Sequence, residues 1–295
     1  MRILSQAKPA DSLTLLFLFC LTMVSLYFHD RIPHVTSVLT IYSALFLIQV
    51  LFIRFAPFMS RNRAANIVRG VVFPVACVLL IFDSLEFLVH TINPKDIDPS
   101  LIRLDYLLLG GYPTVMLESL HARLLTDILQ LAYASYYLLP ISLGLLLNLK
   151  GREREFDKTV FLILLCFYLS YIGYLLFPAL GPRYTMDHLQ STELRGLFVA
   201  EPIQRILNEI EGIKRDAFPS GHTAVVLVVA GLAYRFEKGF FSLTLPVIIL
   251  LIFSTVYCRY HYVVDVIGGA LLAAITFFIG DKYYGYWETR NNTHH

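Results

Sequence analysis

The sequence predicts an all-α, polytopic membrane protein in which about eight transmembrane helices form a bundle. Of the 295 residues, 57% are hydrophobic and only 16% are charged, a composition too apolar for a soluble domain. The apolar residues fall in runs of about 20, the length that a helix needs to cross a bilayer. These runs lack the alternation of barrel strands, so a helical bundle is the remaining way to pair every backbone polar group within hydrocarbon.

Eight apolar runs follow one another along the chain, each close to the length of a spanning helix. Arg2 and Lys8 precede the first run, as basic residues do in a signal peptide. No cleavage site of small residues follows, so we interpret this run as a retained span. The predicted spans are residues 11–29, 34–54, 67–90, 124–148, 158–180, 218–236, 240–258 and 261–280.

The distribution of Lys and Arg between the loops predicts the orientation. The loops on the side of the termini hold 14 basic residues, whereas the opposite loops hold 10, and half of those ten lie in the loop at 181–217. Basic residues accumulate in short cytoplasmic loops. Both termini are therefore expected in the cytoplasm, and the opposite loops on the periplasmic, extracellular or lumenal side.

Two connecting segments are too polar to cross the membrane. Residues 91–123 mix charged side chains with apolar ones around a Gly-Gly-Tyr-Pro sequence, which favours an interfacial or re-entrant cap. The loop at 181–217 contains a helical stretch near Pro202 to Ile210. The predicted organisation is thus three N-terminal spans at 1–90, the cap at 91–123, a core at 124–285 and a tail at 286–295.

Charge and cysteine content argue against several functions. The net charge is +2 and no basic block is interleaved with aromatic residues, so nucleic-acid binding has no support and the lipid bilayer is the expected environment. The four cysteines lie singly within apolar runs. Neither a disulfide framework nor a cysteine zinc site is therefore indicated. The oligomeric state is not defined by the sequence.

The first part of a site is the sequence Phe-Pro-Ser-Gly-His-Thr at 218–223, which joins a polar loop to an apolar run. Ser220 is expected to cap the helix that begins there. The unpaired N–H groups of its first turn and the positive end of the helix dipole favour an anion. His222 adds a titratable group, so we interpret the stretch as half of a phosphate-handling site.

The second part is Arg-Tyr-His-Tyr-Val-Val-Asp at 259–265. His261 and Asp265 are four residues apart and therefore lie on one face of a helix, one turn from each other. Asp265 can hold one imidazole nitrogen of His261 and leave the other as a nucleophile.

The predicted spans bring these parts together. The span from residue 218 descends about 28 Å, and the next span returns by the same length, so Arg259 and His261 reach the side of His222. The preceding span ends shortly before Arg183 on that side, and Lys214 and Arg215 precede residue 218. Arginines and backbone amides bind phosphate, while one histidine attacks phosphorus and the other protonates the departing oxygen. The set therefore suits phosphoryl transfer without a metal or cofactor.

Three other interpretations fit these residues less well. Each histidine or arginine alone could be an interfacial side chain that snorkels to water, but their convergence favours a functional site. Two histidines and an aspartate could bind zinc, yet no further ligand accompanies them and the arginines would repel a cation. A transporter or scramblase would place ionisable groups near the bilayer midplane within repeated halves, and the sequence has neither feature.

At these residues the sequence resembles the type-2 phosphatidate phosphatase superfamily, also called lipid phosphate phosphatases. The P-S-G-H motif of that family matches residues 219–222, and its H-x-x-x-D motif matches His261 and Asp265. The resemblance covers roughly residues 120–280 and implies a six-helix core. It also implies that His261 forms a phosphohistidine and that Asp265 orients it. By the same resemblance, His222 is the general acid and then activates the acceptor, and the residues that bind phosphate are Ser220 and Gly221.

The phosphate clamp departs from the family pattern K-x6-R-P. Arg183 matches its arginine, but Leu176 replaces the lysine and Tyr184 replaces the proline. The arginine expected six residues before His261 is Thr255, and an arginine stands instead two residues before it. The predicted phosphate-binding side chains are therefore Arg183 and Arg259, with Lys214 and Arg215 as further candidates.

The residues before the second histidine, Ser254-Thr255-x-Tyr257, resemble the branch of inositol phosphorylceramide synthases. Those enzymes move a phospho-headgroup to another acceptor instead of water. We therefore expect a lipid phosphatase or a phosphotransferase acting on a phosphorylated lipid, with water or a lipid or polyol hydroxyl as acceptor. An acidic pair, Asp83 and Glu86, lies near the outer end of the third span. Candidates for contact with the substrate are Asp105, Glu118, His121 and Tyr184.

Overall fold

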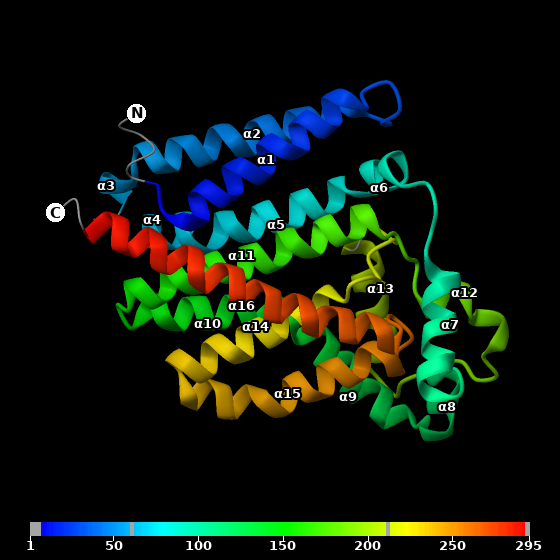
Figure 1. Cartoon of the computed structure of the whole chain (residues 1–295). Coiled ribbons are helices and arrows are strands. Elements are labelled where there is room, and N and C mark those ends of the chain that lie inside the picture. The colour runs from blue at the N-terminus through cyan, green and yellow to red at the C-terminus, as the bar shows by residue number, and fades with distance from the viewer. Residues whose placement is uncertain (1–6, 60–61, 211–212, 293–295) are drawn as a thin grey trace.

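The computed structural model describes residues 7–59, 62–210 and 213–292, and the secondary structure of this part of the chain consists of helices and turns, with no strand. Within it, seven helices are long and apolar enough to cross a membrane. They run alongside one another (Figure 1), which confirms the predicted all-α, multi-pass membrane bundle. The remaining predicted span, 218–236, corresponds to α14 (Gly221–Phe236), an apolar helix of 16 residues.

The N-terminal part begins with a pair of spanning helices, α1 (Pro9–Tyr27) and α2 (Val35–Arg54). Phe17 of α1 stacks on Tyr168 of α11 (Glu153–Leu176), with ring centroids 4.4 Å apart. The first two helices are thus joined to the rest of the bundle by aromatic packing. A short helix, α3 (Ala56–Met59), follows α2.

The third predicted span, 67–90, is interrupted. It consists of α4 (Arg63–Ile67), a π-helical turn at Val68–Val72, α5 (Phe73–Ser84) and α6 (Glu86–Ile92). Pro74 stands at the beginning of α5 and cannot donate a backbone hydrogen bond, which accounts for the irregular turn just before it. The spanning part covers Ala64–Ser84.

The segment predicted as a cap lies across one end of the bundle. Its main element, α7 (Asp98–Leu109), runs across the direction of the long helices (Figure 1). It ends at Gly110, whose positive φ of 71° suits glycine. The short helix α8 (Pro113–Met116) and a 3-10 turn at Leu117–Leu120 complete the segment.

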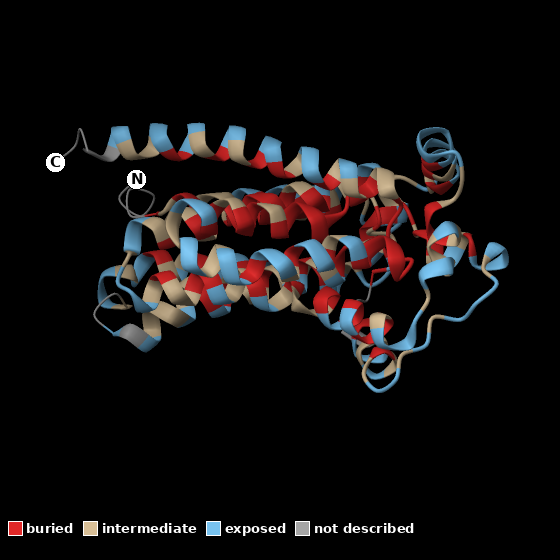
Figure 2. Ribbon diagram, turned by 90° about the horizontal axis from the view of Figure 1, so that it is seen from below, coloured by how far each residue is buried: buried red, intermediate tan, exposed pale blue. Residues whose placement is uncertain are grey.

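The core consists of helices around α14. They are α9 (Arg123–Ala134), a 3-10 turn at Ser135–Tyr137, α10 (Leu138–Leu149), α11 (Glu153–Leu176), α15 (Lys238–Tyr257) and α16 (Val263–Asn292). Figure 2 shows buried residues in the interior of the bundle and exposed residues on its outer faces. The side chains of α14 from Gly221 to Val226 are all buried, so this helix is central. The residues predicted as a tail from 286 continue α16 to Asn292, and 293–295 lie outside the described residues.

Ion pairs define the end of the bundle opposite the cap. Lys8, just before α1, lies 2.8 Å from Asp157 near the beginning of α11. Arg154 on the same turn of α11 pairs with Glu288 near the end of α16, with Nε and Oε1 2.6 Å apart. The beginning of α1 and the end of α16 therefore lie at the same end, and the loop at 181–217 lies at the other. That loop contains α12 (Pro182–Thr185), a 3-10 turn at Asp187–Leu189 and α13 (Ala200–Ile210).

Candidate active site

The amino end of α14 is held by its cap and by α16. Ser220 Oγ accepts a hydrogen bond from the Thr223 amide at 3.3 Å, which confirms the predicted N-cap. The Ser220 amide in turn donates to the Asp265 carbonyl oxygen at 3.0 Å. Gly269 of α16 lies against this turn, where a Cβ would overlap the Ser220 carbonyl oxygen. A side chain at residue 269 would therefore push α16 away from the site.

His261 lies in the turn between α15 and α16. The amides of Tyr260 and His261 both donate to the Thr255 carbonyl at 2.9 Å, and Arg259 adopts a left-handed backbone with φ of 64°. These bonds reverse the chain, and the His261 side chain is buried. Thr255, which stands at the position of the family's arginine, thus contributes its backbone to the turn.

The contacts of His261 define its tautomer. Its Nδ1 lies 2.8 Å from the Ala217 carbonyl oxygen. Because a carbonyl oxygen only accepts, Nδ1 carries the proton, and the unprotonated Nε2 directs its lone pair toward His222 Nδ1 at 3.4 Å. Burial, opposed in part by the nearby Asp216 charge and the Ala217 bond, lowers the pKa of His261 to about 4. The imidazole is therefore neutral near pH 7 and its Nε2 is available as a nucleophile.

Asp265, predicted to orient His261, lies beside that ring at a longer distance. Its Oδ2 is 3.5 Å from His261 Nδ1 and accepts a hydrogen bond from the Tyr262 amide at 2.8 Å. The shortest polar contact of His261 Nδ1 is therefore the Ala217 carbonyl. Sequence reasoning missed this partner, because a backbone carbonyl carries no signature of residue type.

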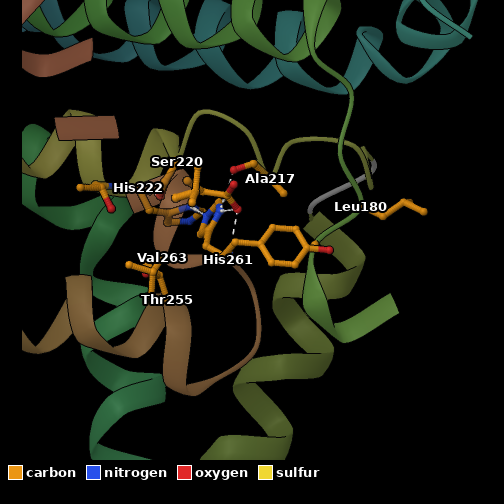
Figure 3. Close-up of polar contacts among 12 residues, drawn as sticks. Leu180, Ala217, Ser220, His222, Thr255, His261 and Val263 are labelled. Atoms are coloured by element: carbon orange, nitrogen blue, oxygen red, sulfur yellow. Dashed lines mark hydrogen bonds and ion pairs between the residues drawn. The ribbon is translucent and has the colours of Figure 1, made fainter. Parts of the chain in front are cut away.

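His222 faces His261 across a short gap. His222 Nδ1 and His261 Nε2 are 3.4 Å apart, and Figure 3 shows the two side chains beside each other. The His222 ring lies between Tyr133 and Tyr136, with centroid distances of 4.4 and 4.2 Å. Its Nε2 has no hydrogen-bond partner among the described residues. The tyrosines thus fix the ring while one nitrogen stays available for chemistry.

Arg183 is brought to the histidines by α12. Its amide donates to the Arg259 carbonyl at 2.9 Å. Its guanidinium packs over the rings of Tyr184 and Tyr260, 4.7 and 5.0 Å from their centroids. Gly181 precedes α12 with a φ of 87°, and a Cβ there would overlap the Tyr260 carbonyl oxygen. Glycine at 181 therefore allows the arginine-bearing turn to approach the histidine-bearing turn.

The other predicted clamp residues have different surroundings. Arg259 Nη2 lies 2.9 Å from Glu118 Oε1 and 2.7 Å from the Thr192 carbonyl oxygen. Arg215 Nε pairs with Asp96 at 2.9 Å. Lys214 is exposed. A phosphate would therefore compete with a carboxylate for Arg259 and for Arg215.

The four candidate substrate contacts are separated by the structure. Asp105 is buried, and its two oxygens accept hydrogen bonds from the Val263 and Val264 amides at 2.9 Å. It anchors the beginning of α16, and its predicted contact with the substrate stays a prediction. His121 Nε2 is buried with no hydrogen-bond partner among the described residues, and Tyr184 is 43% exposed beneath the Arg183 guanidinium.

Glu118 ties the cap to the loop at 181–217. It accepts hydrogen bonds from the Ser191 hydroxyl at 2.6 Å and from the Ser191 and Thr192 amides. Burial opposes its charge, but these bonds and the Arg259 charge outweigh burial and hold the pKa of Glu118 below its ordinary value. Its contacts therefore make it the partner of Arg259.

Two further buried aspartates anchor loops around the site and were missed from the sequence. Asp98 accepts hydrogen bonds from the Leu180 and Gly181 amides at 2.9 Å and from the Tyr262 hydroxyl at 2.8 Å. Asp127 accepts from four successive amides, at residues 197–200. Apart from the Tyr262 hydroxyl, their partners are backbone N–H groups far away in the sequence. The only available signal was an acidic residue within or next to an apolar run.

Two cavities reach the site from different elements. One of about 610 Å³ is lined by Arg183, Arg259 and Arg195 together with acidic side chains of the loop at 181–217. The other, of about 230 Å³, is lined by apolar and tyrosine side chains and by His222, Asp216 and Asp83. The first combines arginines with carboxylates, whereas the second combines apolar surface with carboxylates.

These features define a multi-pass membrane protein with two facing histidines and an arginine at one end of a helical bundle. A family model described as the PAP2 superfamily matches residues 99–279, more than half of the chain, and the chain belongs to this superfamily. Membership supports a phosphatase-type enzyme.

The chain is also similar to a PA-phosphatase related-family protein of Dictyostelium discoideum, with 27% identity over 187 residues. The alignment covers 56% of this chain and 34% of that protein, so the chain matches about a third of its relative's length. No solved structure matches the chain significantly.

Proposed function

We propose that the protein is a lipid phosphatase or phosphotransferase that acts on a phosphorylated lipid through a phosphohistidine at His261. The observation that carries this proposal is the 3.4 Å distance between His261 Nε2 and His222 Nδ1, with the Nδ1 proton of His261 held by the Ala217 carbonyl. Membership of the PAP2 superfamily supports a phosphorylated lipid as substrate.

In the first step, Nε2 of neutral His261 attacks phosphorus. A P–N bond forms, the bond from phosphorus to the lipid alcohol oxygen breaks, and that oxygen takes a proton from His222. Arg183 and the amino end of α14, with Ser220 and Gly221, stabilise the charge on the phosphate oxygens. The positive charge that develops on His261 is stabilised by Asp265, whose Oδ2 lies 3.5 Å from Nδ1.

In the second step, His222 takes the proton of the acceptor while the acceptor oxygen attacks phosphorus. The P–N bond breaks and its electron pair returns to His261 Nε2. Water as acceptor gives inorganic phosphate, whereas a lipid or polyol hydroxyl gives a new phosphoester. Hydrolysis and transfer use the same catalytic side chains. Whether water or a hydroxyl is the acceptor therefore depends on which of them has access to His222.

The test is turnover by purified protein in lipid nanodiscs. A panel of lipid phosphates and phospholipids is supplied with and without diacylglycerol or ceramide, and free phosphate is measured against new lipid product. We expect His261→Ala to lower turnover by at least about 10³-fold, whereas His29→Ala, on an exposed residue, leaves it unchanged. Turnover that survives His261→Ala would reject the assignment.

We also propose that the site lies on the periplasmic, extracellular or lumenal side, with both termini cytoplasmic, from the excess of basic residues in the loops at the other end. Phe198 is 79% exposed in the loop at 181–217. A cysteine at 198, in a background with Cys20 replaced by Ser, is expected to react with a membrane-impermeant maleimide from outside intact cells or from the lumen of sealed vesicles. Labelling from the cytoplasmic side alone would reverse the orientation.

A further inference from the structure

An apolar groove leads from the site along α5. The cavity of about 230 Å³ that reaches His222 adjoins a second cavity of about 320 Å³, because four residues line both. These shared residues are Val78, Leu79, Tyr137 and Phe167. The second cavity continues between α5, α10 and α11 as far as Gly70, Gly144 and Thr159. We refer to the two cavities together as the α5 groove.

The α5 groove has the dimensions and surface of a site for hydrocarbon. From Asp83 to Gly70 it follows 13 residues of helix, or about 20 Å. One leaflet of a bilayer is about 15 Å deep, half of the ~30 Å hydrocarbon core. Leu79 lines both cavities and is 40% exposed on the outer face of α5. A chain can therefore pass sideways from the bilayer into the groove.

The charges at the two cavities indicate which part of a substrate enters the groove. Asp83 and Asp216 line its end near His222 and disfavour a phosphate there. The other cavity is lined by three arginines as well as by acidic side chains, and one of the arginines is Arg183. In a displacement at phosphorus, the departing oxygen lies opposite the attacking nitrogen, on the side of the general acid His222. The end of the groove therefore fits the lipid alcohol, and the arginine cavity fits the phosphate.

We propose that the α5 groove binds a hydrocarbon chain of the lipid alcohol esterified to the phosphate, and that it measures the length of this chain. The proposal rests on the proposed function for the reaction at His222. The wall formed by α5 (Phe73–Ser84) lies outside residues 99–279, the part matched by the superfamily. The third span, through α5, thus contributes to the choice of substrate.

The test narrows the groove from two walls. Val78 lines both cavities, and at Gly144 an added Cβ would meet only Phe156, at an ordinary distance of 3.8 Å. The variants are Val78→Trp and Gly144→Leu. The matched control is Val72→Trp, because Val72 precedes α5 by one residue, is 53% exposed and lines neither cavity.

Turnover is measured on lipid phosphates with 4-carbon and 16-carbon chains. Each buried methylene contributes about fourfold to binding, so Val78→Trp and Gly144→Leu are expected to lower kcat/KM for the long chain at least tenfold. The short-chain substrate should change less than about twofold, which also shows that the variants fold. Val72→Trp should leave both unchanged. Equal losses for both chain lengths, or no loss for the long chain, would overturn the proposal.

A binding measurement separates failure of the groove from failure of the chemistry. A 16-carbon lipid phosphate with a photoreactive group in its chain is added to the His261→Ala variant, which is not expected to turn it over. We expect crosslinks to α5 and α10, reduced by Val78→Trp and kept in Val72→Trp. Crosslinks elsewhere would overturn the proposal for the groove. Crosslinks in the groove without turnover by the native protein would support the groove and reject the phosphatase or transferase reaction.

Discussion

Replacement of Asp105 by Ala distinguishes an anchor of α16 from a substrate contact. Asp105 accepts hydrogen bonds from two amides, each at 2.9 Å, and is 2% exposed. A hydrogen bond to a charged group contributes about 1.5–3 kcal/mol, so two would give about 3–6 kcal/mol. Burial of the carboxylate offsets part of this sum and raises the pKa of Asp105 despite the two amides. We therefore expect Asp105→Ala to destabilise the protein by about 2–4 kcal/mol.

The assay is thermal unfolding in detergent, followed by steady-state kinetics well below Tm. A loss of this size corresponds to a decrease in Tm of roughly 5–10 °C. Asp105→Asn, which keeps one acceptor oxygen but turns an NH2 group toward the other amide, should lose a similar amount. Asp30→Ala is the control, because the side chain of Asp30 is 85% exposed. An unchanged Tm with an increased KM would refute the anchoring role and support Asp105 as a substrate contact.

Three further changes test the histidines and the clamp. The pKa of His261 lies below its ordinary value, at about 4. The imidazole is therefore almost entirely neutral above about pH 5, and this neutral, nucleophilic form is lost as the pH falls through about 4. An acidic limb of kcat/KM near pH 6.5 would contradict this. Arg183→Ala is expected to lower kcat/KM by about 100-fold. Arg215→Ala is expected to lower kcat/KM by less than about tenfold, because the native Arg215 guanidinium pairs with Asp96. Similar losses in the two variants would mean that the phosphate clamp is misassigned. Asp265→Asn should lower kcat by about 100-fold, because the Ala217 carbonyl still binds Nδ1 of His261. A loss of ~10⁴-fold is expected only where an aspartate alone holds the histidine tautomer, so a loss of that size would make Asp265 the main partner of His261.

The sequence alone predicted the helical bundle and the proximity of the two histidines. Span length alone returns the chain from His222 to His261, and the two rings lie 3.4 Å apart. The break near Pro74 could not be predicted from the apolar pattern, because the apolar run at 67–90 continues through the irregular turn and past the end of α5 at Ser84. Apolar composition predicts a crossing, whereas local hydrogen bonding decides where the helix is continuous.

The groups that hold the site in place could not be predicted from residue types. Asp98 and Asp105 bind amides that follow them by about 80 and 160 positions, and the Ala217 carbonyl binds His261 across 44 positions. Arg259 was predicted to bind phosphate, yet its guanidinium lies 2.9 Å from Glu118. A charged residue that becomes buried requires a hydrogen-bonding or charged partner, but which group is its partner depends on the three-dimensional fold.

The covalent intermediate tests the central claim most directly. A lipid phosphate labelled with ³²P is mixed with the native protein, with His222→Ala and with His261→Ala, and the reactions are quenched within the first turnover. We predict an alkali-stable, acid-labile label on the peptide that contains His261 in the native protein, longer-lived in His222→Ala and absent from His261→Ala. Label on another residue, or continued turnover by His261→Ala without any label, would contradict the account.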